Sequence, residues 1–249
     1  MIEKKHLIKL LVLIAVIFAI ILLGTTLVSA TDIESGECGS EGDNVTWVLK
    51  NHVLTISGQG EMAWNKVCSP WAYNKKIYEV IIEEGVTNVA REAFYECINI
   101  KKVSLPNSLK YIKTGAFGCC KNLTKINIPN NIKYISGRAF GGCSSLERVK
   151  LPDSIKKIYA QTFSGCKSLI EINIPDGVEE IQRNAFRRCE SLESIVIPGS
   201  VKDIEENAFK GCTSLKDLTL SDGIRVIGQW AFADCTSLTS ISIPRKCFC

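Results

Sequence analysis

Apolar side chains recur at a fixed interval of 23 residues along most of this chain. The repeating units begin at residues 86, 109, 132, 155, 178, 201 and 224, and we number them as coils 1 to 7. A degenerate unit at 63–85 precedes them, with Trp71 at the position of a repeated phenylalanine. A repeat of this period predicts a solenoid, because one unit cannot bury its own apolar face and must stack on its neighbours. The phenylalanine is present in all seven coils: Phe94, Phe117, Phe140, Phe163, Phe186, Phe209 and Phe232.

The sequence within each coil predicts a strand and a turn. Residues 194–198 read SIVIP, with alternating apolar and polar positions, β-branched residues and a final proline, which indicates a short strand. The AF..C stretch that precedes it places Phe and Cys three residues apart, which favours one short helical or 3₁₀ turn. Stacked coils would align the strands into a parallel β-sheet.

Residues 31–62 lack the 23-residue repeat, and their sequence predicts a cap for the solenoid. Apolar residues alternate with polar ones from Val45 to Leu49 and again at Leu54 and Ile56, with the short stretch KNH between them. This pattern is typical of a β-hairpin. A hairpin here would cover the first coil, whose core would otherwise face water. We therefore expect a cap at 31–62, a solenoid at 63–246 and a C-terminal remnant at 247–249.

The first thirty residues have the layout of a targeting segment. Three lysines are followed by an apolar run from Leu10 to Leu23, and Val28 and Ala30 are small residues before a cleavage point after Ala30. This predicts a secretory signal peptide at 1–30. An uncleaved membrane anchor is the alternative, because the uncharged stretch is long enough to span a bilayer. In both cases the rest of the chain is expected to be secreted or on the cell surface.

The repeat pattern sL..i.IP.s...I...aF..C resembles the BspA-like, or Treponema-type, leucine-rich repeats. The segment GECG…VTWVL…LTISGQGEM…SPW resembles the cap that often precedes them, so the resemblance covers about 34–246. It implies a leucine-rich-repeat solenoid of stacked 23-residue coils, with a parallel β-sheet, short helical or 3₁₀ turns and an N-terminal β-hairpin cap. It also implies a bacterial or protist surface protein that adheres to host or neighbouring-cell proteins.

Seven cysteines follow the repeat, and they could form disulfides, a metal array or part of the core. Equivalent residues of stacked coils lie about 4.8 Å apart, whereas disulfides need Cβ atoms about 3.8 Å apart and facing each other. A linear row also cannot supply a tetrahedral metal site. We therefore interpret them as buried packing residues. They are Cys97, Cys120, Cys143, Cys166, Cys189, Cys212 and Cys235.

The remaining five cysteines lie outside this register. Cys38 and Cys68 both fall near the cap and could form a disulfide. Cys119 would point away from Cys120 on a helical turn, and we expect it to be exposed. Cys247 and Cys249 are expected to be loose thiols at the C-terminus, where a disulfide with a partner is an alternative.

Composition and motifs argue against several functions. The chain has 30 Lys and Arg against 26 Asp and Glu, and loss of residues 1–30 would leave a net charge of +2, so no nucleic-acid partner is expected. After residue 30 the only histidine is His52, in the hairpin turn, and phosphate-loop and zinc motifs are absent. Glu171 and Asp217 share a strand position about 10 Å apart, but we interpret them as solvated charges. We expect no enzyme activity, no cofactor and no metal.

Side chains that flank the inward strand positions should point away from the core. We predict that they bind an extracellular or host protein, and that the chain itself is a monomer that meets a membrane only through an uncleaved N-terminus. One alternative is a carbohydrate-binding surface module, although this strand face lacks aromatic residues. Another is a structural paralogue fragment without its anchor domain. The predicted ligand-binding residues are Lys102, Ser104, Lys125, Asn127, Arg148, Lys150, Glu171 and Asn173.

Overall fold

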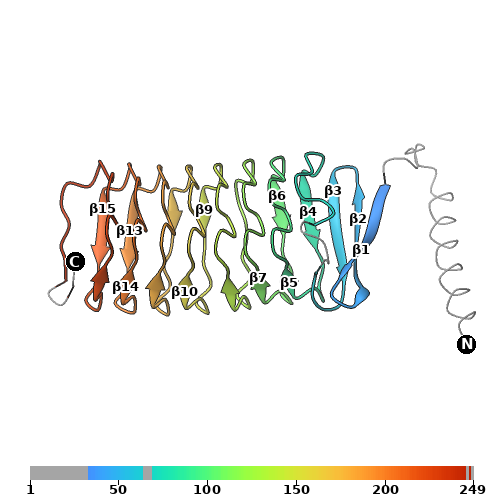
Figure 1. The fold of residues 1–249 in the computed structure, drawn as a ribbon, viewed down its shortest axis with the longest axis horizontal. Helices are drawn as coiled ribbons and strands as arrows, with labels where there is room; N and C mark the ends of the chain where they lie inside the picture. Colours follow the sequence, from blue (N-terminus) through green and yellow to red (C-terminus); the bar gives the residue numbers. More distant parts are fainter. Residues whose placement is uncertain (1–32, 64–68, 245–246, 248–249) are drawn as a thin grey trace, which may run out of the picture. The chain divides into compact units, whose positions relative to one another are not determined.

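The computed structural model describes residues 33–63, 69–244 and 247. These residues form a solenoid of stacked coils that begins with antiparallel strands, which confirms the expected fold (Figure 1). The predicted signal peptide, Cys68 and Cys249 lie outside the described residues. Within the described part, no helix has the length and apolar character needed to cross a membrane.

The N-terminal cap is a three-stranded antiparallel sheet. β1 (Ile33–Gly39) pairs with β2 (Gly42–Lys50), and β2 pairs with β3 (Val53–Gly58). Asn51 and His52 form the hairpin turn with φ of 49° and 66°, the left-handed conformation that tight hairpin turns require. β3 then pairs in parallel with the first strand of the solenoid, so the sheet of the cap continues into the repeats.

Short parallel strands near the end of most coils form a first strand row. Register within the row follows the repeat, as in the pairing of Glu79 with Lys102. The described pairs are β3 with β4 and β4 with β6, then β9 with β11, and β13 with β15. The strands are β4 (Glu79–Ile82), β6 (Lys102–Ser104), β9 (Arg148–Val149), β11 (Glu171–Ile172), β13 (Ser194–Ile197) and β15 (Asp217–Leu220).

A second strand row, which the sequence pattern did not reveal, lies at the start of each coil. It forms the parallel sheets β5-β7-β8 and β10-β12-β14-β16. Each strand has only two residues, which is too short for an alternating pattern to stand out. The strands are β5 (Asn88–Val89), β7 (Tyr111–Ile112), β8 (Tyr134–Ile135), β10 (Lys157–Ile158), β12 (Glu180–Ile181), β14 (Asp203–Ile204) and β16 (Val226–Ile227).

The AF..C stretches form successive turns, and the prediction of short helical or 3₁₀ turns was wrong in this detail. The Cys97 amide donates to the Phe94 carbonyl of its own coil at 3.1 Å, whereas the Phe94 amide donates to Ala116 of the next coil at 2.8 Å. Alternate amides thus bond to the neighbouring coil, which interrupts the continuous pattern of a helix. Glu92 and Glu96 allow this by adopting left-handed φ values of 51° and 55°.

The repeated phenylalanines stack on one another along the core. Ring centroids of successive residues from Phe94 to Phe232 lie 5.0 to 5.6 Å apart, with planes within 15° of parallel. Trp71 extends this stack toward the cap, 6.0 Å from Phe94. The rings from Phe94 to Phe209 are fully buried, so each contributes both apolar burial and ring contacts to the stability of the stack.

The seven cysteines in register are buried, free thiols, which confirms the packing interpretation. Each thiol also donates a hydrogen bond to a carbonyl of the preceding coil, at 3.1 to 3.3 Å. Cys38 is likewise a free, buried thiol, and its suggested partner Cys68 lies outside the described residues. Cys119 was expected to be exposed; it is half-buried, because its turn is not helical and it has a φ of 58°.

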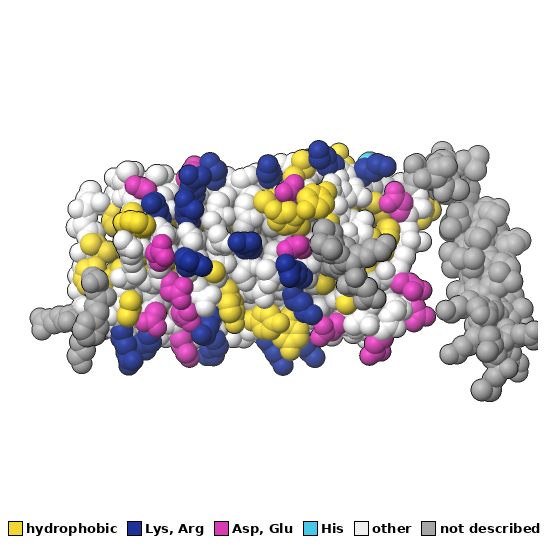
Figure 2. Space-filling model, in the orientation of Figure 1, with side chains coloured by type: hydrophobic (Ala, Val, Ile, Leu, Met, Phe, Trp, Pro, Cys, Tyr) yellow, Lys and Arg dark blue, Asp and Glu magenta, His cyan; other side chains and the backbone are white. Residues whose placement is uncertain are grey.

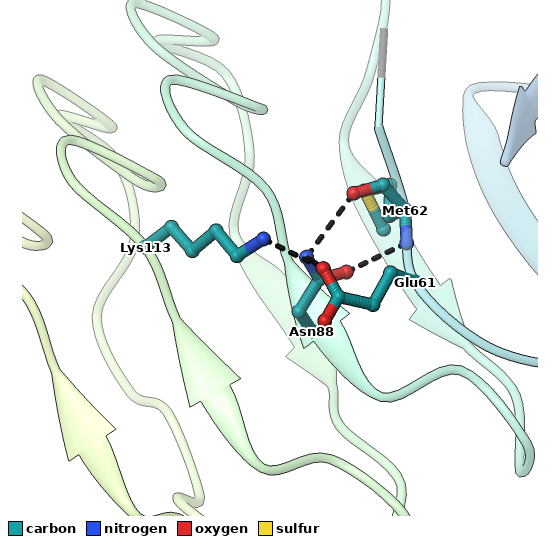
Figure 3. A network of polar contacts seen from close by, with 4 residues as sticks. All are labelled: Glu61, Met62, Asn88 and Lys113. Atoms are coloured by element: carbon teal, nitrogen blue, oxygen red, sulfur yellow. Dashed lines mark hydrogen bonds and ion pairs between the residues drawn. The ribbon is translucent and has the colours of Figure 1, made fainter. Parts of the chain in front are cut away.

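A buried asparagine joins the cap to the second strand row (Figure 3). The Asn88 side chain in β5 accepts a hydrogen bond from the Met62 amide at 2.6 Å and donates to the Met62 carbonyl at 3.1 Å. Glu61 lies beside it and forms an ion pair with Lys113 of coil 2 at 2.8 Å. The asparagine therefore satisfies backbone groups that would otherwise be buried without partners at the edge of the row.

Candidate functional site

The predicted binding residues lie on the outward side of the first strand row. Their side chains are exposed, except that Ser104 is half-buried. On the face seen in Figure 2, Lys and Arg are scattered among Asp and Glu along the stack, without a continuous basic surface. That distribution fits contacts with small charged patches better than contacts with a long polyanion.

A groove of about 500 Å³ brings six of the eight predicted residues together. It spans coils 2 to 4, and the apolar residues Ile126, Ile128 and Val149 also line it. Lys102 and Ser104 do not contribute to its walls. The six predicted residues that do are Lys125, Asn127, Arg148, Lys150, Glu171 and Asn173.

The groove lies where the first strand row is interrupted. Coil 2 has no strand at this point, and its contact with coil 3 in this row is a single parallel bridge between Lys125 and Arg148. The Asn173 side chain extends the short ladder between coils 3 and 4, since it accepts from the Leu151 amide at 2.8 Å and donates to its carbonyl at 3.2 Å. Asn173 therefore already has a structural role in holding one wall of the groove.

The charged groups of the groove leave an excess of positive charge. Arg148 forms an ion pair with Glu171 of the next coil. Lys125 and Lys150 have no ion-pair partner among the residues described. One carboxylate thus faces three cations, and two of these cations can meet an incoming carboxylate without first breaking an existing pair.

The two carboxylates considered for catalysis are not paired with each other. Glu171 is held by Arg148, and Asp217 lies in β15 beside Ser194, beyond the intervening coil 5. A closer pair occurs in the second strand row, where burial and a hydrogen bond with Glu180 raise the pKa of Glu205. Glu205 also accepts a hydrogen bond from the Arg183 amide at 2.8 Å, so it serves to join two coils.

Comparison with known proteins agrees with this architecture. The fold and the outward residues define a leucine-rich-repeat solenoid that presents a polar surface. The family model described as "BspA type Leucine rich repeat region (6 copies)" matches residues 69–192 and 179–248. The chain therefore belongs to the BspA-type leucine-rich repeat family. Comparison with curated protein sequences gave no match.

The solved structures similar to this chain include two bacterial leucine-rich repeat proteins. The first is the leucine-rich repeat protein of T. pallidum, with 27% identity, a TM-score of 0.62, and coverage of 86% of this chain and 91% of the other. The second is a leucine-rich cell surface protein from Faecalibacterium prausnitzii, with 22% identity and a TM-score of 0.50, covering 81% of each chain. At that identity the second likeness shows the fold alone.

Proposed function

We propose that this chain is an exported, cell-surface or secreted adhesion protein that binds an extracellular protein ligand through the groove and the adjoining first strand row. Membership of a repeat family suited to protein interaction supports this proposal. The basic leader followed by an apolar run supports export. The description of the similar F. prausnitzii protein as a cell surface protein points the same way.

The observation that carries the proposal is the pair of lysines on the groove without ion-pair partners. Surface lysines attract acidic groups over about a Debye length and so raise the rate of encounter with an acidic patch. Arg148, already oriented by Glu171, presents a planar donor group in a fixed position. In the apolar floor, Ile126 and Val149 are already buried in the core, whereas Ile128 is half-buried and adds apolar area that a partner can bury.

The role of a binding scaffold suits these residues better than catalysis. The single carboxylate of the groove is held in an ion pair, and the groove residues include no histidine or cysteine that could act as a base or nucleophile. Rows of outward side chains on a rigid stack are instead the usual recognition surfaces of repeat proteins.

Charge reversal tests the proposal directly. The Lys125→Glu, Lys150→Glu double variant should lower the association rate with an extracellular-matrix or cell-surface protein ligand by about tenfold or more. The matched control is Lys133→Glu with Lys216→Glu, which changes the net charge equally at exposed positions outside the groove. Binding that the groove variant leaves unchanged, or that both pairs weaken equally, would contradict the proposal.

A further inference from the structure

The turn side of the stack carries a second pocket, of about 460 Å³. It is formed by the AF..C turns of coils 1 to 4 and shares no residue with the groove. The side chains that give it its chemistry are Glu92, Tyr95, Cys119, Arg138, Gln161 and Ser164.

The pocket exists because two coils lack a side chain where the others have one. Coils 2 and 3 carry Gly118 and Gly141 at the repeat position that holds Tyr95 in coil 1. A Cβ atom at Gly118 would lie 2.8 Å from Cδ2 of the Tyr95 ring, so the tyrosine packs against the bare glycine backbone. At the same repeat position, coils 4 to 7 carry Ser164, Arg187, Lys210 and Ala233.

The backbone amides in the floor of the pocket are already bonded within the protein. The Cys119 amide donates to the Gly141 carbonyl at 2.7 Å, and the Gly141 amide donates to the Arg138 carbonyl at 3.0 Å. A ligand must therefore be held by side chains. Glu92 can accept hydrogen bonds, Arg138 can donate them, and the amide of Gln161 can do both.

The charges of the pocket balance. It holds one carboxylate, Glu92, and one guanidinium, Arg138. Both are partly engaged already, because Glu92 contacts Arg91 at 3.4 Å and Nε of Arg138 donates to Gln161 at 2.5 Å. Among the residues that line the pocket, an ionic ligand would find no surplus of opposite charge, whereas hydroxyl groups can exchange hydrogen bonds with each of these side chains.

An aromatic wall completes the site. The Tyr95 ring lines the pocket, and its contact with Tyr73, 5.8 Å between centroids at an angle of 80°, helps to fix its orientation. A ring of this kind offers an apolar surface and a hydroxyl tip together. The volume lies within the usual range of small-molecule sites.

We propose that this pocket binds a neutral carbohydrate. Sugar hydroxyls match the mixture of donors and acceptors, and the C–H face of a sugar ring can pack against Tyr95. The outward face of the first strand row lacks aromatic residues, so a carbohydrate site fits the turn side and not the groove. The inference does not depend on the proposed protein ligand.

Filling the pocket gives a sharp test. Gly141→Gln should place a side chain in it, because Arg187 and Lys210 occupy the same repeat position in coils 5 and 6. A Cβ atom at Gly141 would lie 3.2 Å from the Gln161 carbonyl oxygen, a tight contact that a small shift of the turn relieves. Ala233→Gln makes the matched change in coil 7, outside the pocket. The probe is an array of neutral and anionic oligosaccharides, followed by calorimetric titration of the best neutral glycan with the full chain. We expect Gly141→Gln to weaken binding about tenfold or more, and Ala233→Gln to change it less than about twofold.

A second variant removes the guanidinium without threatening the fold. Arg138 has a φ of 59°, and coil 2 has Gly115 at the same repeat position, so Arg138→Gly should fold at least as well while it weakens glycan binding.

Saturating glycan should also slow alkylation of Cys119, with Cys247 as the internal control. Binding of anionic glycans alone, binding insensitive to both pocket variants, or unchanged Cys119 labelling would each overturn the proposal. Reversal of Lys125 and Lys150 should leave glycan binding intact, which separates this site from the groove.

Discussion

The thiol of Cys166 donates a hydrogen bond to the carbonyl oxygen of Phe140, one coil earlier, at 3.2 Å. The same carbonyl accepts the amide of Cys143 from its own coil at 3.1 Å. Both lone pairs of the oxygen are thus used inside an apolar core, where an unmet acceptor would be costly. The arrangement repeats along the stack, which explains why each of the seven coils has a cysteine three residues after its phenylalanine.

Removing one of these thiols should destabilise the stack. Cys166→Ala loses the hydrogen bond and leaves a small cavity, so we expect the free energy of unfolding to fall by about 2 kcal/mol. Urea denaturation measures the change. Cys119→Ala, at a half-buried thiol outside the register, is the control and should cost less than about 0.5 kcal/mol. Equal effects of the two variants would show that the register has no special role.

Removing a ring from the phenylalanine stack should lower the free energy of unfolding more than removing a thiol does. Phe163 is fully buried between Phe140 and Phe186, with centroids 5.6 and 5.5 Å away. Phe163→Ala should therefore lower the free energy of unfolding by about 3 to 5 kcal/mol. Tyr134→Ala removes an aromatic ring from the surface and serves as the comparison. A loss below about 1 kcal/mol for Phe163→Ala would exclude a core role for this ring.

Backbone conformation at the turns gives an independent prediction. Gly165 has a φ of 75° and a Cβ atom placed there would meet nothing closer than 3.7 Å, so Gly165→Ala adds strain without a clash. We expect a loss of about 1 kcal/mol. Arg188→Ala is the matched control, because Arg188 occupies the same repeat position with a φ of 58° and already carries this strain. A thermal melt that finds Gly165→Ala no less stable than Arg188→Ala would contradict the account.

The buried thiols also predict a loss of stability at alkaline pH. Burial raises the pKa of Cys97 from its ordinary value of 9.0 to about 12. The folded chain therefore keeps this proton at a pH where the unfolded chain has lost it. The stabilising contribution is complete below pH 9 and falls as the pH rises toward 12, by about 1.4 kcal/mol per pH unit for each such thiol.

Denaturation experiments at a series of pH values between 8 and 11 can isolate the contribution of the Cys97 thiol to the loss of stability at alkaline pH. Cys97→Ala should begin less stable but should lose less stability per pH unit than the unmodified chain. Identical slopes for the two proteins would mean that the Cys97 thiol does not contribute.

The interval between equivalent residues was enough to predict the solenoid and its core. A strict period assigns Phe163 and Cys166 to the interior, because every coil must bury the same face against its neighbours. The turn type could not be predicted, since a left-handed φ at Glu92 and Glu96 depends on hydrogen bonds from the adjacent coil. The two-residue strands of the second row, such as Tyr111–Ile112, leave too short a pattern to detect.

The candidate site was predictable in part. Alternation along the strands correctly placed side chains such as Lys125 and Lys150 outside the core. The groove between them depends on an interruption of the strand row at coil 2, which the alternating pattern does not show. Asn173 holds the opposite wall by bonding to the backbone of Leu151. The turn-side pocket could have been detected in the sequence, because Gly118 and Gly141 occupy a repeat position that carries a larger side chain in every other coil.

Quantitative alkylation of the native protein, read by mass spectrometry residue by residue, tests the stacked core most directly. The groove and the turn-side pocket are both built on that core, so both depend on its geometry. We expect Cys119 to react readily and the thiols from Cys97 to Cys212 to be protected until the chain unfolds. Rapid labelling of Cys166 in the folded protein, or its recovery in a disulfide with Cys143 or Cys189, would contradict the account.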